Sequence, residues 1–142
     1  MRILILNGPN LNLLGKREPD IYGNSNFQDF FENLNTMFNG LVYFGYRQSN
    51  VEGELIDILQ SSEENYQAII FNAGGYTHTS VALADCVAAI QVPVVEVHIS
   101  QPAAREEYRH KSLIASKCMG SISGFGLDSY RLAVEALIEK MN

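Results

Sequence analysis

Residues 7–23 have the sequence Asn7-Gly8-Pro9-Asn10-Leu11-Asn12-Leu13-Leu14-Gly15-Lys16-Arg17-Glu18-Pro19-Asp20-Ile21-Tyr22-Gly23 and directly follow the apolar run Ile3-Leu4-Ile5-Leu6. The apolar run predicts a short buried strand. A connection from a strand to a helix usually takes about 2–6 residues, so this segment is much longer than a turn requires. Long ordered loops in compact domains commonly act as lids or binding loops. We therefore expect a functional loop at the end of the first strand.

Composition and charge are those of an ordinary globular domain. The 142 residues, 46% of them hydrophobic and 18% charged, fit one domain over residues 1–142. The formal net charge of −6 argues against nucleic acid as a partner, although a local cationic pocket can still bind a small anion. No apolar run is long enough to span a membrane, and no signal-peptide pattern is present. Cys86 and Cys118 stand alone and indicate reduced thiols, so we expect a cytoplasmic protein.

Apolar runs alternate with helical patterns along the whole chain. This alternation predicts a parallel sheet with helices on both faces, a flavodoxin-like three-layer α/β sandwich with five strands in the order 2-1-3-4-5. The expected strands are 3–6, 41–46, 68–71, 93–99 and 120–124. We expect a first helix after a capping box at Ser25 and a second after a cap at 49–50. A third helix is expected over 80–90, and a short helix with a loop within 102–117. The last helix is expected to be capped by Asp128 or Ser129.

Three polar segments follow strands of this predicted sheet. They are residues 7–23 after the first strand, 72–79 after the third and 98–100 at the end of the fourth. In such sheets ligands bind beyond the carboxyl ends of the strands, at the switch point between the first and third. We therefore expect the three segments to line one crevice.

The first segment offers a candidate general base. Pro19 favours a turn that brings Arg17 and Tyr22 together, and a nearby guanidinium favours the phenolate form of a tyrosine. Such a pair on a loop can form a base when the loop closes. From these residues alone, the alternative remains that Tyr22 packs on the loop and Arg17 is solvated.

The fourth strand offers a candidate general acid. Glu96 and His98 are two residues apart on a strand, so both side chains leave the same face. A carboxylate beside an imidazole fixes its tautomer and favours its charged form. A structural histidine is the alternative, and the position of His98 at the predicted crevice favours catalysis.

Groups that bind anions and hydroxyls surround this position. Ile99 and Ser100 offer backbone N–H groups and a hydroxyl, and Asn72 and His78 can bond hydroxyls. The basic run from Arg105 to Lys111 is either a solvated face or part of a cationic mouth that favours a small anionic substrate.

Several other classes of site lack support in the sequence. His78, His98 and His110 are dispersed and have no acidic cluster around them, so no metal site is expected. Neither GxGxxG nor the P-loop pattern occurs, and no lysine lies in an apolar strand as a Schiff-base mechanism requires. A flavodoxin-like binding module for a nucleotide or flavin is the first alternative to an enzyme.

The motifs as a set resemble the type II 3-dehydroquinate dehydratase family over the whole chain. The segments that carry the resemblance are 7–19 with Tyr22-Gly23, Asn50-Val51-Glu52-Gly53-Glu54-Leu55, 72–80, Glu96-Val97-His98-Ile99-Ser100, 105–110, 120–126 and Tyr130-Arg131-Leu132-Ala133. The resemblance implies a metal-free and cofactor-free trans dehydration of 3-dehydroquinate to 3-dehydroshikimate through an enolate. It also implies a homododecamer, a tetramer of trimers. We expect the shikimate pathway as its setting, with quinate breakdown, which uses the same reaction, as the alternative.

The resemblance assigns catalytic roles residue by residue. Tyr22 would remove the C2 proton, and Arg17 would hold its phenolate. His98, with Glu96 behind it, would be the acid for the C1 hydroxyl. Asn12 would position the water that stabilises the enolate.

Binding roles follow in the same way. Asn72 and Ile99-Ser100 would take the substrate carboxylate, His78 and Arg109 would bind ring hydroxyls, and Asp85 would reach in from a neighbouring subunit. The chain departs from the family pattern at Ala73, Gly75, Ala84 and Gln101, and none of these departures removes a proposed catalytic group. A member of the family retained for assembly without activity is the second alternative.

Overall fold

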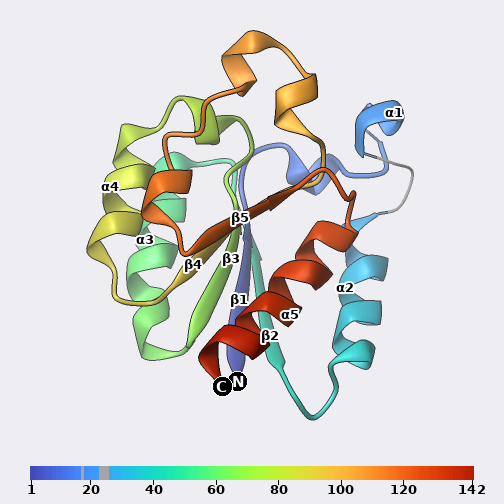
Figure 1. Ribbon diagram of the computed structural model, residues 1–142, viewed down its shortest axis with the longest axis vertical. Coiled ribbons are helices and arrows are strands. Elements are labelled where there is room, and N and C mark those ends of the chain that lie inside the picture. Colours follow the sequence, from blue (N-terminus) through green and yellow to red (C-terminus); the bar gives the residue numbers. More distant parts are fainter. Residues whose placement is uncertain (17, 23–25) are drawn as a thin grey trace.

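The computed structural model describes residues 1–16, 18–22 and 26–142, which build a parallel β-sheet of five strands (Figure 1). The strands are β1 (Arg2–Asn7), β2 (Tyr43–Gln48), β3 (Ala68–Asn72), β4 (Val94–His98) and β5 (Gly120–Ser123). Their order is β2-β1-β3-β4-β5, and every neighbouring pair is parallel. The predicted sheet and its order are confirmed.

Helices cover both faces of the sheet and make the predicted three layers (Figure 1). The helices that do so are α2 (Phe27–Met37), α3 (Glu52–Ser61), α4 (Val81–Ala89) and α5 (Asp128–Met141), while the short α1 (Pro19–Tyr22) lies in the loop after β1. Helices α2 and α5 pack on one face, and α3 and α4 pack on the other.

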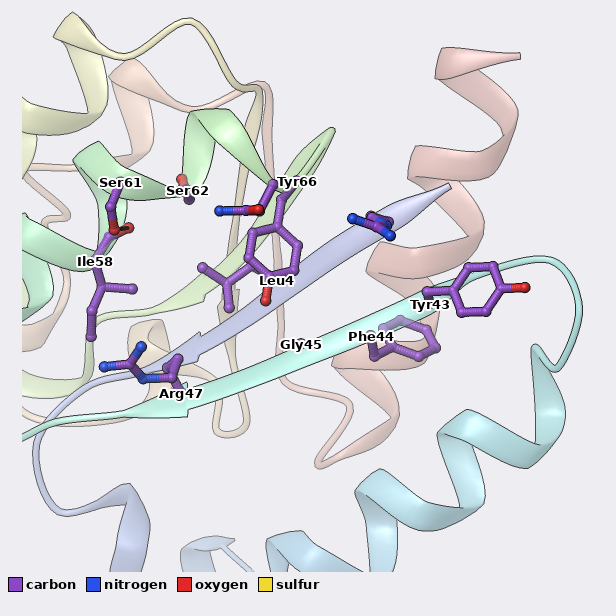
Figure 2. Close-up of a pocket in the computed structure, with 11 residues that line it drawn as sticks. Leu4, Tyr43, Phe44, Gly45, Arg47, Ile58, Ser61, Ser62 and Tyr66 are labelled. Atoms are coloured by element: carbon purple, nitrogen blue, oxygen red, sulfur yellow. Dashed lines mark hydrogen bonds between the residues drawn. The ribbon is translucent and has the colours of Figure 1, made fainter.

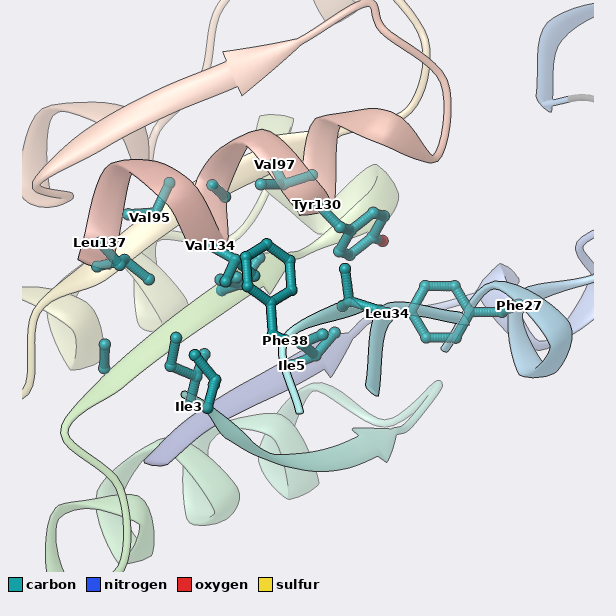
Figure 3. Close-up of a cluster of buried hydrophobic side chains, with 14 of the residues drawn as sticks. Ile3, Ile5, Phe27, Leu34, Phe38, Val95, Val97, Tyr130, Val134 and Leu137 are labelled. Atoms are coloured by element: carbon teal, nitrogen blue, oxygen red, sulfur yellow. The ribbon is translucent and has the colours of Figure 1, made fainter. Parts of the chain in front are cut away.

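Successive side chains of β1 point to opposite faces of the sheet, and this explains the two cores. Ile3 and Ile5 join the cluster under α2 and α5, whereas Leu4 and Leu6 join the cluster under α3 and α4. Figure 3 shows the first cluster, which includes Tyr130 of α5. A strand buried on both faces has an uninterrupted apolar sequence, as the first run of the chain does.

The start of α2 differs by one residue from the prediction. Asn26, not Ser25, is the N-cap: its Oδ1 accepts from the Asp29 N–H at 2.9 Å, and its Nδ2 donates to Asp29 Oδ2 at 3.1 Å. The capping-box prediction was wrong because Asn26 and Asp29 form their own reciprocal pair, and Ser25 lies outside the described residues.

The cap predicted for α5 is also wrong. The N-cap is Leu127, without a side-chain hydrogen bond. The Asp128 carboxylate accepts from Arg131 at 2.6 Å, and the Ser129 hydroxyl accepts from the Phe125 N–H at 3.1 Å. Both candidate side chains are thus engaged with other partners.

Strand β2 begins two residues later than predicted, and the cap of α3 differs. The Val42 N–H still donates to the Phe38 carbonyl at 3.0 Å, so it belongs to the turn after α2. Val51 is the N-cap of α3 and has no side-chain cap, while the Ser49 hydroxyl accepts from the Val51 N–H at 3.0 Å.

The segment 102–117 contains three single 3-10 turns instead of the predicted short helix. They are η4 (Pro102–Ala104), η5 (Glu107–Arg109) and η6 (Ala115–Lys117). Figure 1 shows the first part of this orange segment, with η4 and η5, and α1 at the end of the sheet where β1, β3 and β4 terminate; the part with η6 lies beside α4. The 3-10 turns η1 (Leu11–Leu13) and η3 (Gly74–His78) follow β1 and β3 at the same end, whereas η2 (Ser62–Glu64) follows α3. No helix in the described ranges is long and apolar enough to cross a membrane.

Candidate active site

A crevice of about 140 Å³ lies beyond the carboxyl ends of β1, β3 and β4. It brings together the three segments that the sequence placed at this edge, and it adds two arginines from the segment after β4. The lining residues are Pro9, Asn10, Leu11, Asn72, Gly74, Gly75, His78, His98, Ile99, Ser100, Pro102, Arg105 and Arg109. The predicted crevice is therefore present at the predicted edge.

His98 and Glu96 form a pair at the end of β4. His98 Nε2 lies 3.5 Å from Glu96 Oε1, and the Glu96 side chain is only 3% exposed. Burial alone would raise the pKa of Glu96, but hydrogen bonds from His98, Ser112 and Ser121 outweigh burial and lower it below its ordinary value. Glu96 is thus a buried, ionised carboxylate that orients the imidazole of His98.

His78 faces His98 from the loop after β3. The two rings are stacked, with 6.4 Å between their centroids. His78 Nδ1 lies 2.8 Å from the Lys111 carbonyl oxygen, so Nδ1 carries the proton and donates to that carbonyl. This bond fixes the tautomer of His78 when the ring is neutral.

Two arginines make one wall of the crevice cationic. Arg105 donates to the Ser100 hydroxyl at 3.3 Å and lies 4.0 Å from Glu18 Oε2, which belongs to the loop after β1. Arg109 donates to Glu106 at 2.8 Å. Arg105 thus connects the loop after β1 to the residues that end β4.

Asn72 closes the floor of the crevice through a buried network. Its Nδ2 donates to Tyr130 Oη at 2.9 Å, and Tyr130 Oη donates to Asn7 Oδ1 at 2.7 Å. Asn72 Oδ1 accepts from the Gly74 N–H at 3.1 Å. An amide NH2 carries two hydrogens, so Asn72 keeps one to donate to a ligand.

Comparison with known proteins gives the same family as the sequence motifs. The family model for class II dehydroquinase matches residues 1–138. The chain belongs to the class II dehydroquinase family.

Relatives of this family resemble the chain over nearly its full length. A protein of Exiguobacterium sp. named 3-dehydroquinate dehydratase is 54% identical over 139 residues, which cover 98% of this chain and 95% of the relative. A Prochlorococcus marinus protein of the same name is 49% identical, covering 97% and 96%. The crystal structure of type II dehydroquinase from Butyrivibrio crossotus superimposes with a TM-score of 0.93 at 41% identity, covering 96% of this chain and 97% of that one.

Most residues to which the family resemblance gives a binding role line the crevice of this chain. They are Asn72, His78, Ile99, Ser100 and Arg109, together with the acid candidate His98. Arg105, from the basic run that the sequence offered as part of a cationic mouth, also lines the crevice. Arg105 precedes η5 and Arg109 is the last residue of η5.

Of the predicted site residues, Asn12 and Asp85 are not among those that line the crevice, Tyr22 belongs to α1, and a fourth is not among the residues that the structure describes. Asn12 is exposed on η1 and does not line the crevice, whereas Asn10 of the same loop does. Asp85 is exposed on α4, away from the crevice of its own chain. Tyr22 is the last residue of α1, and Arg17 lies outside the described residues. Their roles stay predictions.

Sequence reasoning missed the hydroxyls around Glu96. Ser112 and Ser121 both donate to its carboxylate, yet only their places in the basic segment and the fifth strand were noted. The register of β4 on β5 pairs Glu96 with Ser121, and this pairing could have been found by aligning the two strands.

A larger hollow lies at the opposite side of the sheet and plays no part in this site. It has about 790 Å³ and is bounded by β1, β2, α3 and residues 62–66, with Tyr66 over Gly45 and with Arg47 at one end (Figure 2). The chemistry of the lining, rather than the volume, marks the crevice as the candidate active site.

Proposed function

We propose that the protein is a 3-dehydroquinate dehydratase that removes water from 3-dehydroquinate in a reversible trans elimination. The observation that carries this proposal is the His98–Glu96 pair at a crevice with a cationic wall, in a chain of the class II dehydroquinase family. The named relatives support it because they carry the dehydratase name at about half identity over almost the whole chain.

The first proposed step removes the C2 proton and forms an enolate. Tyr22, held as phenolate by Arg17, is the proposed base. An ordinary tyrosine has a pKa of about 10, so ionisation at pH 7 needs about 4 kcal/mol of stabilisation at 1.36 kcal/mol per unit. A partly desolvated guanidinium supplies much of this stabilisation. Asn12 positions the water that stabilises the enolate oxygen.

The second proposed step expels the C1 hydroxyl. Protonated His98 donates a proton to the departing oxygen, and the product is a conjugated enone and water. Glu96 stabilises the imidazolium before transfer and fixes the ring toward the crevice. No metal or cofactor takes part in these proposed steps.

The proposed binding mode places the substrate carboxylate at the end of β4. The N–H groups of Ile99 and Ser100 and the remaining N–H of Asn72 bind it, and His78 and Arg109 bind ring hydroxyls. Asp85 enters from a neighbouring subunit of a homododecamer, a tetramer of trimers. Native mass spectrometry tests the assembly. The Asp85→Ala variant should bind substrate more weakly while the dodecamer stays intact.

We further place the reaction in the shikimate pathway, which supplies chorismate and the aromatic amino acids, and in the cytoplasm. Free Cys86 and Cys118 fit a reducing compartment. Expression in a bacterial strain that lacks dehydroquinase should restore growth without aromatic amino acids.

The test is direct. Purified protein is mixed with 3-dehydroquinate, and the ultraviolet absorbance of the enone is followed. Absence of product at micromolar protein would refute the proposal and favour an inactive assembly protein. A yellow or nucleotide-absorbing preparation would favour a flavin or nucleotide module instead.

A further inference from the structure

The carboxylate of Glu96 is held by two hydroxyl groups as well as by His98. Oε1 accepts from Ser112 Oγ at 2.6 Å, and Oε2 accepts from Ser121 Oγ at 3.1 Å. His98 Nε2 lies 3.5 Å from Oε1. Each carboxylate oxygen therefore has a hydroxyl partner, although the residue is only 2% exposed.

Backbone N–H groups around Ser112 direct its hydroxyl hydrogen toward Glu96. Its Oγ accepts from the N–H groups of Ile114 at 3.2 Å and Ala115 at 3.0 Å. A serine hydroxyl has two lone pairs and one hydrogen, so these two bonds leave only the hydrogen for Glu96. Ser112 is thus a fixed donor that requires an acceptor, and an ionised carboxylate is acceptor-only.

Ser121 is placed by the register of the sheet. It pairs with Glu96 across β4 and β5, so the two side chains leave the same face of adjacent strands. Ser123, two residues further on the same strand, pairs with His98, but its hydroxyl donates to Gln101 Oε1 at 3.0 Å. Two serines on one face of β5 thus differ in whether they reach Glu96.

We propose that Ser121 and Ser112 are positioning residues for the acid half of the reaction: together they keep Glu96 ionised and oriented against His98. This inference rests on the proposed dehydratase function for its kinetic consequence. Its structural consequence, the ionisation of Glu96, does not depend on substrate.

The charges around Glu96 agree with this role. Burial raises the pKa of Glu96, while His98, Ser112 and Ser121 lower it, and the net direction is downward. Burial and the nearby Glu96 charge raise the pKa of the Cys118 thiol to about 12, so that neighbour stays neutral. Besides Glu96 and His98, the titratable groups around the adjoining hollow of about 210 Å³ are His78, Arg109 and His110.

The experiment compares Ser121→Ala with its matched control Ser123→Ala. The carboxyl carbon of Glu96 is followed by 13C NMR as pH is varied, and Glu96→Gln identifies its signal. We expect the pKa of Glu96 to rise in Ser121→Ala and in Ser112→Ala and to stay at the wild-type value in Ser123→Ala. Ser121→Thr, which keeps the hydroxyl, should restore the wild-type titration.

The kinetic prediction follows from the same loss of a hydrogen bond to Glu96. In Ser121→Ala, kcat for 3-dehydroquinate should fall about tenfold near neutral pH, because one hydrogen bond to a charged group is lost. The deficit should grow as pH falls, while KM changes little. Ser123→Ala should keep the wild-type pH profile.

Two results would overturn the inference: an unchanged Glu96 titration in Ser121→Ala, or equal shifts in Ser121→Ala and Ser123→Ala. Its failure is distinct from failure of the proposed function. Wild-type protein without dehydratase activity refutes the function, whereas the NMR comparison still decides whether the hydroxyls hold Glu96 ionised.

Discussion

At the scale of single residues, the two halves of the proposed chemistry are built differently. The acid half lies on a strand: Glu96 is buried, His98 lies beside it, and both belong to β4, which is an inner strand of the sheet. The proposed base lies on the long loop after β1. Glu18 of this loop forms an ion pair with Arg105. Removing the base should therefore affect the reaction without disturbing the fold.

We expect Tyr22→Phe to reduce kcat about 10²–10⁴-fold, the usual contribution of a general base, because the ring stays and the ionisable hydroxyl is lost. KM should change little. The matched control is Tyr43→Phe, which removes the hydroxyl of a tyrosine that is 68% exposed on β2. Steady-state kinetics measure both, and wild-type turnover in Tyr22→Phe would exclude this residue as the base.

Cys118 provides a second prediction at this scale. Burial raises its pKa to about 12, so at pH 8 about one thiol in 10⁴ is ionised, against about a quarter for an ordinary cysteine of pKa near 8.5. Alkylation by iodoacetamide should thus be about 10³-fold slower in the native protein than in urea. Peptide mass spectrometry measures the rate, and rapid native labelling of Cys118 would contradict the prediction.

At the scale of elements, the sequence predicted the strands better than the helix ends. Apolar runs such as Ile3–Leu6 identify a strand because burial on both faces demands them. Caps depend on competition between neighbouring side chains. Asn26 is the N-cap of α2 because its side chain pairs with Asp29, and the Ser129 hydroxyl accepts from the Phe125 N–H instead of capping α5.

The candidate site shows the same division. The crevice was predictable because strand ends of a parallel sheet share an edge. The hydroxyls of Ser112 and Ser121 were not, since the first depends on an irregular segment of 3-10 turns and the second on the register of two strands. Asn10 lines the crevice and Asn12 does not: Asn10 is the N-cap of η1 in the left-handed conformation, with φ 68°, whereas Asn12 lies exposed within η1.

Glycine positions at strand ends lead to a prediction about how elements approach one another. A Cβ on Gly8 would lie 2.6 Å from the Ala73 carbonyl oxygen, so the backbone after β3 would have to move. Gly8→Ala should destabilise by about 2–3 kcal/mol, as overpacking does. It should also lower activity, because the crevice is lined from the same loop. The free energy of unfolding in urea measures the stability effect.

Two other glycines serve as controls for Gly8→Ala. At Gly45 a Cβ would meet the ring of Tyr66, a side chain that can rotate away (Figure 2), so the cost should be about 1 kcal/mol. At Gly53, in the first turn of α3, nothing lies within 4 Å, and alanine should stabilise by about 0.5 kcal/mol. If Gly8→Ala lowers the free energy of unfolding no more than Gly53→Ala does, the close approach of Gly8 to Ala73 is wrong.

At the scale of the whole molecule, the C-terminal helix is connected to the floor of the crevice. Tyr130 of α5 is fully buried in the core between α2, α5 and the sheet, where Phe27 packs edge-on against it at 5.2 Å (Figure 3). Its hydroxyl contacts Asn7 at the end of β1 and Asn72 at the end of β3. One side chain thus joins the last helix, the two central strands and the candidate active site.

Tyr130→Phe tests this connection. The substitution keeps the ring but leaves Asn7 Oδ1 and Asn72 Nδ2 buried without this partner, and a buried polar group left unpaired costs about 1–3 kcal/mol. We expect the urea midpoint to fall with an unchanged m-value, because the surface exposed on unfolding is the same. Affinity for 3-dehydroquinate should fall as well, since Asn72 loses the bond that orients its amide toward the proposed carboxylate site. In Tyr43→Phe, where the hydroxyl lies on the exposed edge strand, both quantities should stay within about 0.5 kcal/mol of the wild type. A Tyr130→Phe protein that unfolds at the wild-type urea concentration would show that α5 is held to the sheet by its apolar face alone.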